Sequence, residues 1–308
     1  MASSSSIASK GSLDIAGEME VEAFRRLFPH RYYEHYLAQS VRPDARPLNH
    51  ARETTIALGP VTSVDGSALV KIGESTMLAA IKLEVMTPAA DLPDKGCLAV
   101  DFYMPPVCSP TVRPGRPAEI APVISKKLQD VIVSSGMINF EELSLISGKA
   151  AWMAYLDIYC LNADGSLFDA ALLSAVAAFS HLKVPLVSVN DNGRVTTVPG
   201  ELLESKSELE LVNKERRKLS FKSIPFSLTC LLHNKYILAD PTAEEEDIMD
   251  TLVTVVVDSI GQLVSLYKAG GMVLANTSTV KDCVALAKRR AAELQNILLE
   301  SLSEMEVD

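Results

Sequence analysis

An aspartate–glycine turn, Ala163-Asp164-Gly165, is the stretch of this sequence whose position could support chemistry. It follows the apolar run WMAYLDIYCL and leads into SLFDAALLSAVAAF, a segment that is apolar on almost every side. Backbone amides at the start of a helix favour an anion. The spacing predicts a strand, a turn that could cradle an anion, and a buried helix over residues 169–182, with Asp169 as its cap.

Other groupings with recognisable chemistry are weaker. The five histidines show no metal-ligand spacing beyond His30 and His35, which are five residues apart among aromatic side chains. The sequence contains no P-loop and no G-x-G-x-x-G motif. We therefore expect neither a metal site nor a bound cofactor.

Length and composition restrict the class of protein. The 308 residues are 48% hydrophobic, enough for one large domain or two ordinary ones. A net charge of −10 argues against a protein that binds nucleic acid without a partner. The five scattered cysteines form no C-x-x-C pair, which favours a reducing compartment without a disulfide framework. No secretory signal or apolar run of membrane-spanning length is present, so we expect a soluble intracellular protein.

Hydrophobic periodicity predicts the elements that must position the turn. The first half should begin with a broken helix (residues 18–39) and an extended connector (42–46). A β-meander (54–85) follows, with tight turns at 64–67 and 73–74. A long loop (86–118) and an amphipathic helix (119–136) complete this half. After the buried helix, a strand follows Pro185, residues 200–220 form a charged excursion, and hairpins lead to a helix from about Thr279. Thr279 and Asp282 form a predicted capping pair.

This order of elements indicates an α+β fold whose sheets are covered by helices on one side. Each half holds hairpins followed by a helix, so the two halves should be similar. The predicted boundaries are a disordered tail at residues 1–17, a first domain at 18–185 and a second domain with the C-terminal helix at 186–308.

Four segments in a fixed order resemble the RNase PH family: RPDARPL, VDGSALVKIGESTMLAAIKLE, NADGSLFDAALLSAVAAF and ILADPTAEEED. The resemblance extends from about Tyr32 to Leu302. It implies the RNase PH-like fold, of the ribosomal protein S5 domain 2-like type, with two similar halves of β-sheet plus helix. Active members are phosphate-dependent 3′ to 5′ exoribonucleases, which need donors for phosphate and acids for a metal or a proton.

The phosphate donors of active members are missing here. In those members the turn continues as Ala-Asp-Gly-Gly-Thr-Arg, whereas this chain has Leu167 in the threonine position and Phe168 in the arginine position. Neither side chain can donate a hydrogen bond, and each lost charge-assisted contact is worth ~1.5–3 kcal/mol. We therefore favour the alternative to an anion-binding site: a strand-to-helix turn that is packed with two hydrophobic side chains.

Two further family motifs are only partly kept. GRPAEI retains Arg116 of the phosphate-binding arginine motif, so Arg116 and the nearby Arg113 are candidates for RNA contact or are simply solvated loop residues. In DPTAEEED, Asp240 and Glu246 occupy the positions of catalytic or metal-binding acids, and we interpret them as vestigial. The alternative is that Asp240 ends a strand and the acids form a solvated face or the start of a helix.

The resemblance implies a catalytically silent subunit of the ring of the eukaryotic RNA exosome, active in rRNA maturation and RNA decay. Its partners would be other RNase PH-like subunits in a hetero-hexameric ring, S1/KH-type cap subunits and RNA in the channel, with no membrane. The expected locations are nucleus, nucleolus and cytoplasm. The alternative function is an active phosphorolytic 3′ to 5′ exoribonuclease with a phosphate site built from Arg116 and Asp240.

Overall fold

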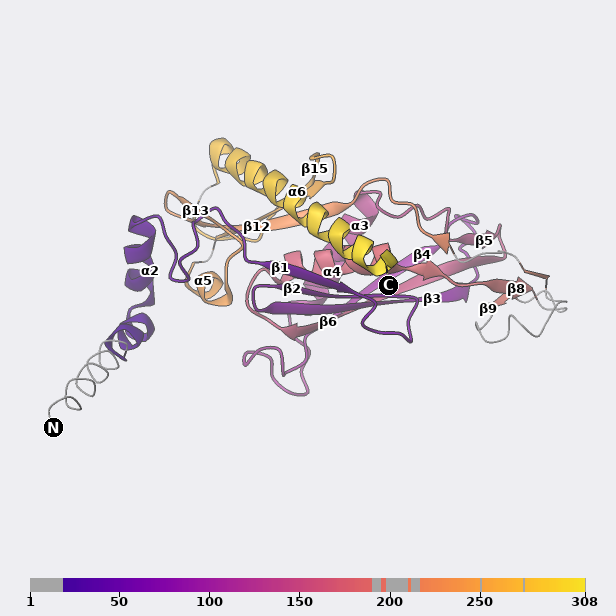
Figure 1. Ribbon diagram of the computed structural model, residues 1–308, viewed down its shortest axis with the longest axis horizontal. Coiled ribbons are helices and arrows are strands. Elements are labelled where there is room, and N and C mark those ends of the chain that lie inside the picture. The colour runs from indigo at the N-terminus through magenta and orange to yellow at the C-terminus, as the bar shows by residue number, and fades with distance from the viewer. Residues whose placement is uncertain are drawn as a thin grey trace.

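Two β-sheets with helices packed between them form the protein in the computed structural model (Figure 1). The structure describes residues 19–189, 195–197, 210–211, 217–249, 251–273 and 275–307. The helix α4 (Leu167–His181) packs on strands of both sheets, and the long C-terminal helix α6 (Thr277–Val307) also contacts both. This mixture of antiparallel sheets and covering helices confirms the predicted α+β class.

The first sheet has the strand order β1-β2-β3-β6-β4, and β5 pairs with β6 beside this path. Its strands are β1 (Thr54–Leu58), β2 (Gly66–Ile72), β3 (Ser75–Met86), β4 (Cys97–Tyr103), β5 (Ser144–Ile146) and β6 (Ala150–Asn162). All pairs are antiparallel except β4 with β6. The crossover between these two parallel strands contains α3 (Ala121–Ser134), which packs on β4.

The second sheet has the order β13-β12-β14-β15 and is antiparallel throughout. Its strands are β12 (Pro225–His233), β13 (Tyr236–Ala239), β14 (Leu252–Asp258) and β15 (Leu263–Lys268). Short strands pair outside the two sheets: β7 (Lys183–Val184) with β11 (Arg217–Lys218), and β8 (Val187–Val189) with β9 (Val195–Thr197) and β10 (Glu210–Leu211).

The two sheets differ in how much of their surface the rest of the chain covers. Residues 19–27 are helical and are followed by α2 (Pro29–Ala38), the indigo segment beside α5 (Ala243–Ile248) in Figure 1. Tyr33 and Leu37 of α2 pack on Leu231 and Leu238 of the second sheet, in a small cluster separate from the main core. The helices that contact the first sheet lie on one side of it, the side where the even-numbered residues of β6 are buried.

The apolar helix predicted after the turn is confirmed, but it begins at Leu167, two residues earlier than expected. Ser166 is the residue that precedes it, with a φ of 49°, and its side chain makes no capping bond. The prediction that Asp169 caps the helix is therefore wrong. Asp169 lies inside the first turn, and its carboxylate accepts a hydrogen bond from the Thr229 amide of β12 at 2.6 Å.

Three other local predictions are wrong. The supposed loop at residues 86–118 contains β4, whose strand partner among the described residues, β6, is distant in sequence, so no local hairpin signal marks it. Gly66 starts β2 instead of a turn; a Cβ there would lie 2.8 Å from the Ala178 carbonyl oxygen, so glycine permits close packing on α4. The last helix begins at Thr277, which places the predicted capping pair inside it.

Some predictions concern residues that the structure does not describe. The predicted tail at residues 1–17 and most of the charged segment at 200–220 lie outside the described residues. All five cysteines are free, and Cys97 is the exposed one. None of the described helices is both long enough and apolar enough to cross a membrane.

Candidate functional site

The turn that follows β6 is pressed against the second half of the chain. Gly165 has a φ of +75°, a conformation that favours glycine, and a Cβ at this position would clash with the Pro241 carbonyl oxygen and the backbone of Thr242. The Ser166 hydroxyl donates to the same Pro241 carbonyl at 3.2 Å. Glycine is therefore required here because two backbone segments meet, and the predicted anion turn is packed against the start of α5.

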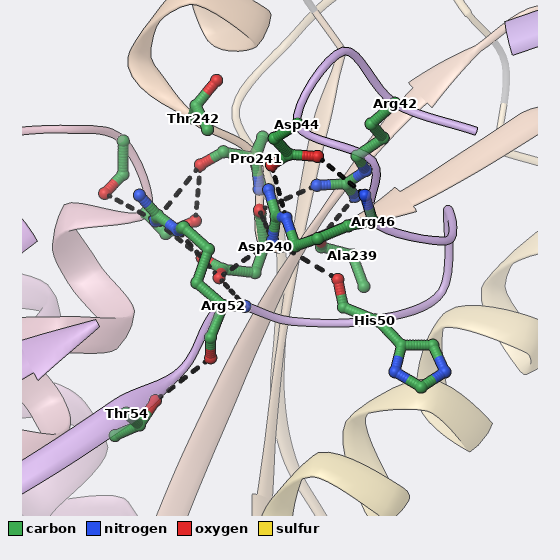
Figure 2. A network of polar contacts seen from close by, with 12 residues as sticks. Arg42, Asp44, Arg46, His50, Arg52, Thr54, Ala239, Asp240, Pro241 and Thr242 are labelled. Carbon is green, nitrogen blue, oxygen red and sulfur yellow. Dashed lines mark hydrogen bonds and ion pairs between the residues drawn. The ribbon is translucent and has the colours of Figure 1, made fainter. Parts of the chain in front are cut away.

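Asp240 lies at the centre of this contact and is held by Arg52 (Figure 2). The Arg52 guanidinium donates from Nε to Oδ2 at 2.9 Å and from Nη2 to Oδ1 at 2.8 Å, and the Arg52 amide donates to Oδ2 at 2.8 Å. Both side chains are buried. Burial alone favours the protonated acid, but the bonds and charge of Arg52 outweigh it and hold the pKa of Asp240 below its usual value.

Arg52 also binds the turn itself. Its Nη1 lies 3.1 Å from the Asp164 carboxylate and donates to the Asp164 carbonyl oxygen, while Nη2 reaches the Gly165 carbonyl oxygen at 3.5 Å. One arginine thus joins the first half of the chain, through the turn, to the second half, through Asp240. Sequence reasoning missed Arg52, because an arginine two residues before a strand carries no local signal of burial.

Two more arginines close the other side of Asp240, both from the segment predicted as a plain extended connector (Figure 2). Arg42 is fully buried and donates to the backbone carbonyls of Asp240, Ala239 and Leu48. Arg46 places Nη1 3.7 Å from Asp240 Oδ2. The Asp240 carboxylate is therefore surrounded by the protein's own cations and amides.

Glu246 places its carboxylate at the start of α4. Its Oε1 accepts the Ser166 amide at 2.8 Å, and the N-terminal end of a helix favours such a negative group. Burial raises the pKa of Glu246 to about 7, against the effect of that hydrogen bond. An amide at the predicted anion turn is thus already bound to a carboxylate of the same chain.

Glu246 is positioned by a capping box that the sequence analysis overlooked. Thr242 caps α5: its hydroxyl accepts the Glu245 amide at 3.4 Å, and the Glu245 carboxylate accepts the Thr242 amide at 3.0 Å. Thr242 and Glu245 stand three residues apart, the spacing that signals this motif in a sequence. The acidic run is therefore a helix start, as one of the two interpretations predicted, but Glu245 is buried in contact with Arg42 instead of solvated.

Leu167 and Phe168 pack where the family's phosphate donors would stand. Phe168 is buried, and its ring meets Tyr267 of β15 edge-on with 6.3 Å between centroids. Leu167 is partly buried against the same core. Both side chains serve packing between α4 and its surroundings and offer no hydrogen-bond donor to an anion.

Arg113 and Arg116 lie apart from this cluster, in the loop between β4 and α3. They line a cavity of about 440 Å³ together with Met104, Val112 and Ile120. Both arginines are exposed, and Arg116 pairs with Glu119 at 2.7 Å. The loop is attached to the turn by a hydrogen bond from the Ala163 amide to the Cys108 carbonyl oxygen at 3.0 Å. The structure places the candidate RNA-contact arginines on an exposed loop, and Asp240 and Glu246 in a closed cluster.

The closed cluster has little capacity for phosphate chemistry. An incoming dianion would meet the carboxylates of Glu246, Asp164 and Asp240, and the nearest cation, Arg52, is already bound to two of them. Within the described ranges, no group of three or more His, Cys, Asp or Glu side chains could hold a metal ion. The arrangement fits a structural ion-pair network better than a catalytic one.

Comparison with known proteins defines the class to which this fold and site belong. Residues 50–185 match domain 1 of the 3′ exoribonuclease family, RNase PH, and residues 223–290 match domain 2. The chain belongs to this family. Its relatives include the exosome complex component rrp43 of Schizosaccharomyces pombe, 31% identical over 87% of this chain and 94% of the relative. The exosome complex component Rrp42 of Methanopyrus kandleri is 32% identical over 85% of this chain and 92% of the relative.

Solved structures give the same fold. A chain of the Archaeoglobus fulgidus exosome with RNA bound to the active site superposes with a TM-score of 0.74 at 27% identity, covering 90% of this chain and 98% of the other. A chain of an archaeal exosome core superposes with a TM-score of 0.70 at 23% identity, covering 92% and 99%. The predicted RNase PH-like fold is therefore confirmed over nearly the whole length of both chains.

Proposed function

We propose that this protein is a non-catalytic subunit of an RNA exosome ring. Two observations support this proposal. Relatives that match this chain over most of their length are exosome components. The turn that binds phosphate in active members is here packed with Leu167 and Phe168, and Glu246 binds its Ser166 amide. The chain would assemble side by side with other RNase PH-like subunits into a hetero-hexamer. It would contribute interface and channel shape to 3′ to 5′ processing and decay, including rRNA maturation.

RNA contact in this proposal falls to the loop with Arg113 and Arg116. Both guanidinium groups are exposed beside a cavity, and neither is engaged by the acids around Asp240. A net charge of −10 suits a subunit that shares RNA binding with its partners. S1/KH-type caps, and work in nucleus, nucleolus and cytoplasm, belong to the same proposal and rest on the family resemblance.

The alternative, an active phosphorolytic exoribonuclease, needs Asp240 and Arg116 at one site. Arg52 binds Asp240 through two hydrogen bonds from its guanidinium, whereas Arg116 pairs with Glu119 on the exposed loop. A phosphate site made from these residues would require both pairs to separate. The contacts therefore favour the non-catalytic role.

The test combines an activity assay with assembly. The isolated chain is incubated with a short 3′-labelled RNA and inorganic phosphate, beside an active RNase PH enzyme as the positive control. We expect no phosphate-dependent release of nucleoside diphosphates. We also expect the tagged chain, purified from its own cells, to carry other RNase PH-like chains in near-equal amounts.

Phosphorolysis that disappears in Asp240→Asn would overturn the lack of catalysis. Because Asp240 is buried in an ion-pair network, the thermal unfolding of this variant must be measured alongside, and Asp91→Asn, in the exposed loop before β4, serves as the control. Recovery of the chain alone, or as a homo-oligomer, would overturn the ring assignment.

A further inference from the structure

The outer face of the first sheet carries an unusual set of side chains on β4 and β6. The parallel register of the two strands places Asp101 beside Asp157 and Tyr103 beside Tyr159. Tyr155 lies two residues before Asp157, so it points to the same face of β6. We call these five residues the tyrosine–aspartate face; none of them takes part in the Asp240 cluster.

The tyrosines of this face are stacked and open to solvent. The rings of Tyr103 and Tyr159 lie nearly parallel, with 4.9 Å between centroids and an angle of 19°, and each residue is 43% exposed. Tyr155 is 38% exposed. Helices pack on the opposite side of these strands. Large aromatic side chains gathered on one open sheet face are typical of a surface that binds a partner.

Between the tyrosines lie two carboxylates, Asp101 and Asp157, that have no counter-ion in the part of the chain that the structure describes. Neighbouring strands are about 4.8 Å apart, so Asp101 and Asp157 are close like charges, an arrangement that destabilises an isolated sheet. Partial burial and the charge of Asp101 both raise the pKa of Asp157. Across the described residues, neither acid forms an ion pair or a side-chain hydrogen bond, and Lys82 of β3, which stands opposite Tyr155, pairs with Glu84 at 3.4 Å.

Small residues flank the two acids. Ala80 of β3 stands opposite Asp157, and Ala99 of β4 stands opposite Tyr155. A planar group could therefore approach the carboxylates with tyrosine rings on either side. Among protein side chains, arginine fits best, because its guanidinium donates in a fork to carboxylates and stacks on aromatic rings.

We propose that the tyrosine–aspartate face docks a segment of a partner protein, with an arginine of that segment bound over Asp101 and Asp157 between the tyrosines. Charge complementarity selects this occupant. RNA could stack on the rings, but its phosphates would be repelled by the two carboxylates. A divalent cation would find two carboxylate side chains where calcium takes six to eight oxygen ligands. The proposal depends on this surface and is independent of whether the chain is catalytic.

The test uses the full chain in the complex purified from its own cells. The photo-crosslinking residue p-benzoylphenylalanine replaces Tyr155, and the crosslinked peptides are identified by mass spectrometry. We expect a protein segment with an arginine near the crosslinked position. The double variant Asp101→Asn/Asp157→Asn should reduce the crosslink yield at least about tenfold, because the arginine loses both charge-assisted contacts.

A matched control removes two negative charges elsewhere. Asp91→Asn/Asp94→Asn, in an exposed loop that precedes β4, should leave the yield unchanged. A synthetic peptide of the crosslinked segment should bind the wild-type chain, and its citrulline version should bind at least about tenfold more weakly. A crosslink to RNA, no crosslink, an unchanged yield in the double variant, or equal binding of the citrulline peptide would each overturn the proposal.

Discussion

Two groups of carboxylates in this protein stand in opposite situations. Around Asp240, arginines of the same chain bind the acids: Arg52 pairs with the buried Asp240 and the half-buried Asp164 and so joins the two halves. On the tyrosine–aspartate face, Asp101 and Asp157 are adjacent and lack a counter-ion among the described residues. A cluster whose charges are satisfied internally stabilises the fold, whereas unpaired charges at the surface remain available to a partner.

The two sheets repeat this contrast. In the second sheet, β12 is buried on both faces by the chain itself, and Tyr33 and Leu37 of α2 cover Leu231. The first sheet leaves Tyr103 and Tyr159 exposed on its outer face. The two sheets thus have different surroundings, and the exposed tyrosines lie on the face where we propose that a partner docks.

The largest expected effect comes from breaking the closed cluster. Arg52→Ala leaves Asp240 charged, buried and without its main partner, so the free energy of unfolding should fall by about 3–5 kcal/mol. Urea unfolding of the full chain measures this. Arg116→Ala, which removes an exposed ion pair, should change stability by less than about 1 kcal/mol. Equal losses in the two variants would contradict the distinction between closed and open charges.

A somewhat smaller effect should follow from truncating the packed turn. Phe168→Ala removes a buried ring that contacts Tyr267, and the free energy of unfolding should fall by about 3 kcal/mol. Phe28→Ala is the control, because that ring is 50% exposed. Thermal unfolding compares the pair. A neutral Phe168→Ala would mean that the side chain does not serve packing and would reopen the question of a ligand at this turn.

Glu246 should make stability depend on pH in a defined direction. Its pKa is raised to about 7 in the folded protein, against about 4.3 in an unfolded chain, so folding favours the protonated acid. The contribution of Glu246 to stability is therefore fully present below about pH 4 and is lost as the pH rises through 7. Glu246→Gln keeps an acceptor for the Ser166 amide, so its melting temperature should gain on the wild type between pH 5 and pH 8. A constant difference over that range would disprove the shift.

The smallest effect should appear on the open face, with the opposite sign. Asp101→Asn removes the repulsion with Asp157 and should raise the free energy of unfolding by about 0.5 kcal/mol. High salt should shrink the gain, because exposed charges are screened. Urea unfolding at low and high salt measures both. A loss of stability would mean that Asp101 has a stabilising partner and would weaken the contrast with Asp240.

Much of the fold followed from local patterns. The alternation along β6, the even hydrophobicity of α4 and the amphipathic face of α3 predicted these elements, because each depends on a period of two or 3.6 residues. The absence of hydrogen-bond donors at Leu167 and Phe168 could also be predicted from the sequence, because the hydrogen-bonding capacity of a side chain is a property of its residue type. The capping box at Thr242 was equally local and could have been predicted.

The tertiary structure decided what these elements bring together. Arg52 and Asp240 are 188 positions apart, and neither residue carries a mark of its partner. The parallel pairing of β4 with β6, which stacks Tyr103 on Tyr159, depends on a crossover through α3 instead of a local turn. Periodicity reports which face of an element is buried, but the contacts between elements are set by how all of them pack at once. Sequence determined most of the elements and the absence of donor side chains at positions 167 and 168; only packing determined which charges are paired within the chain and which remain unpaired at its surface.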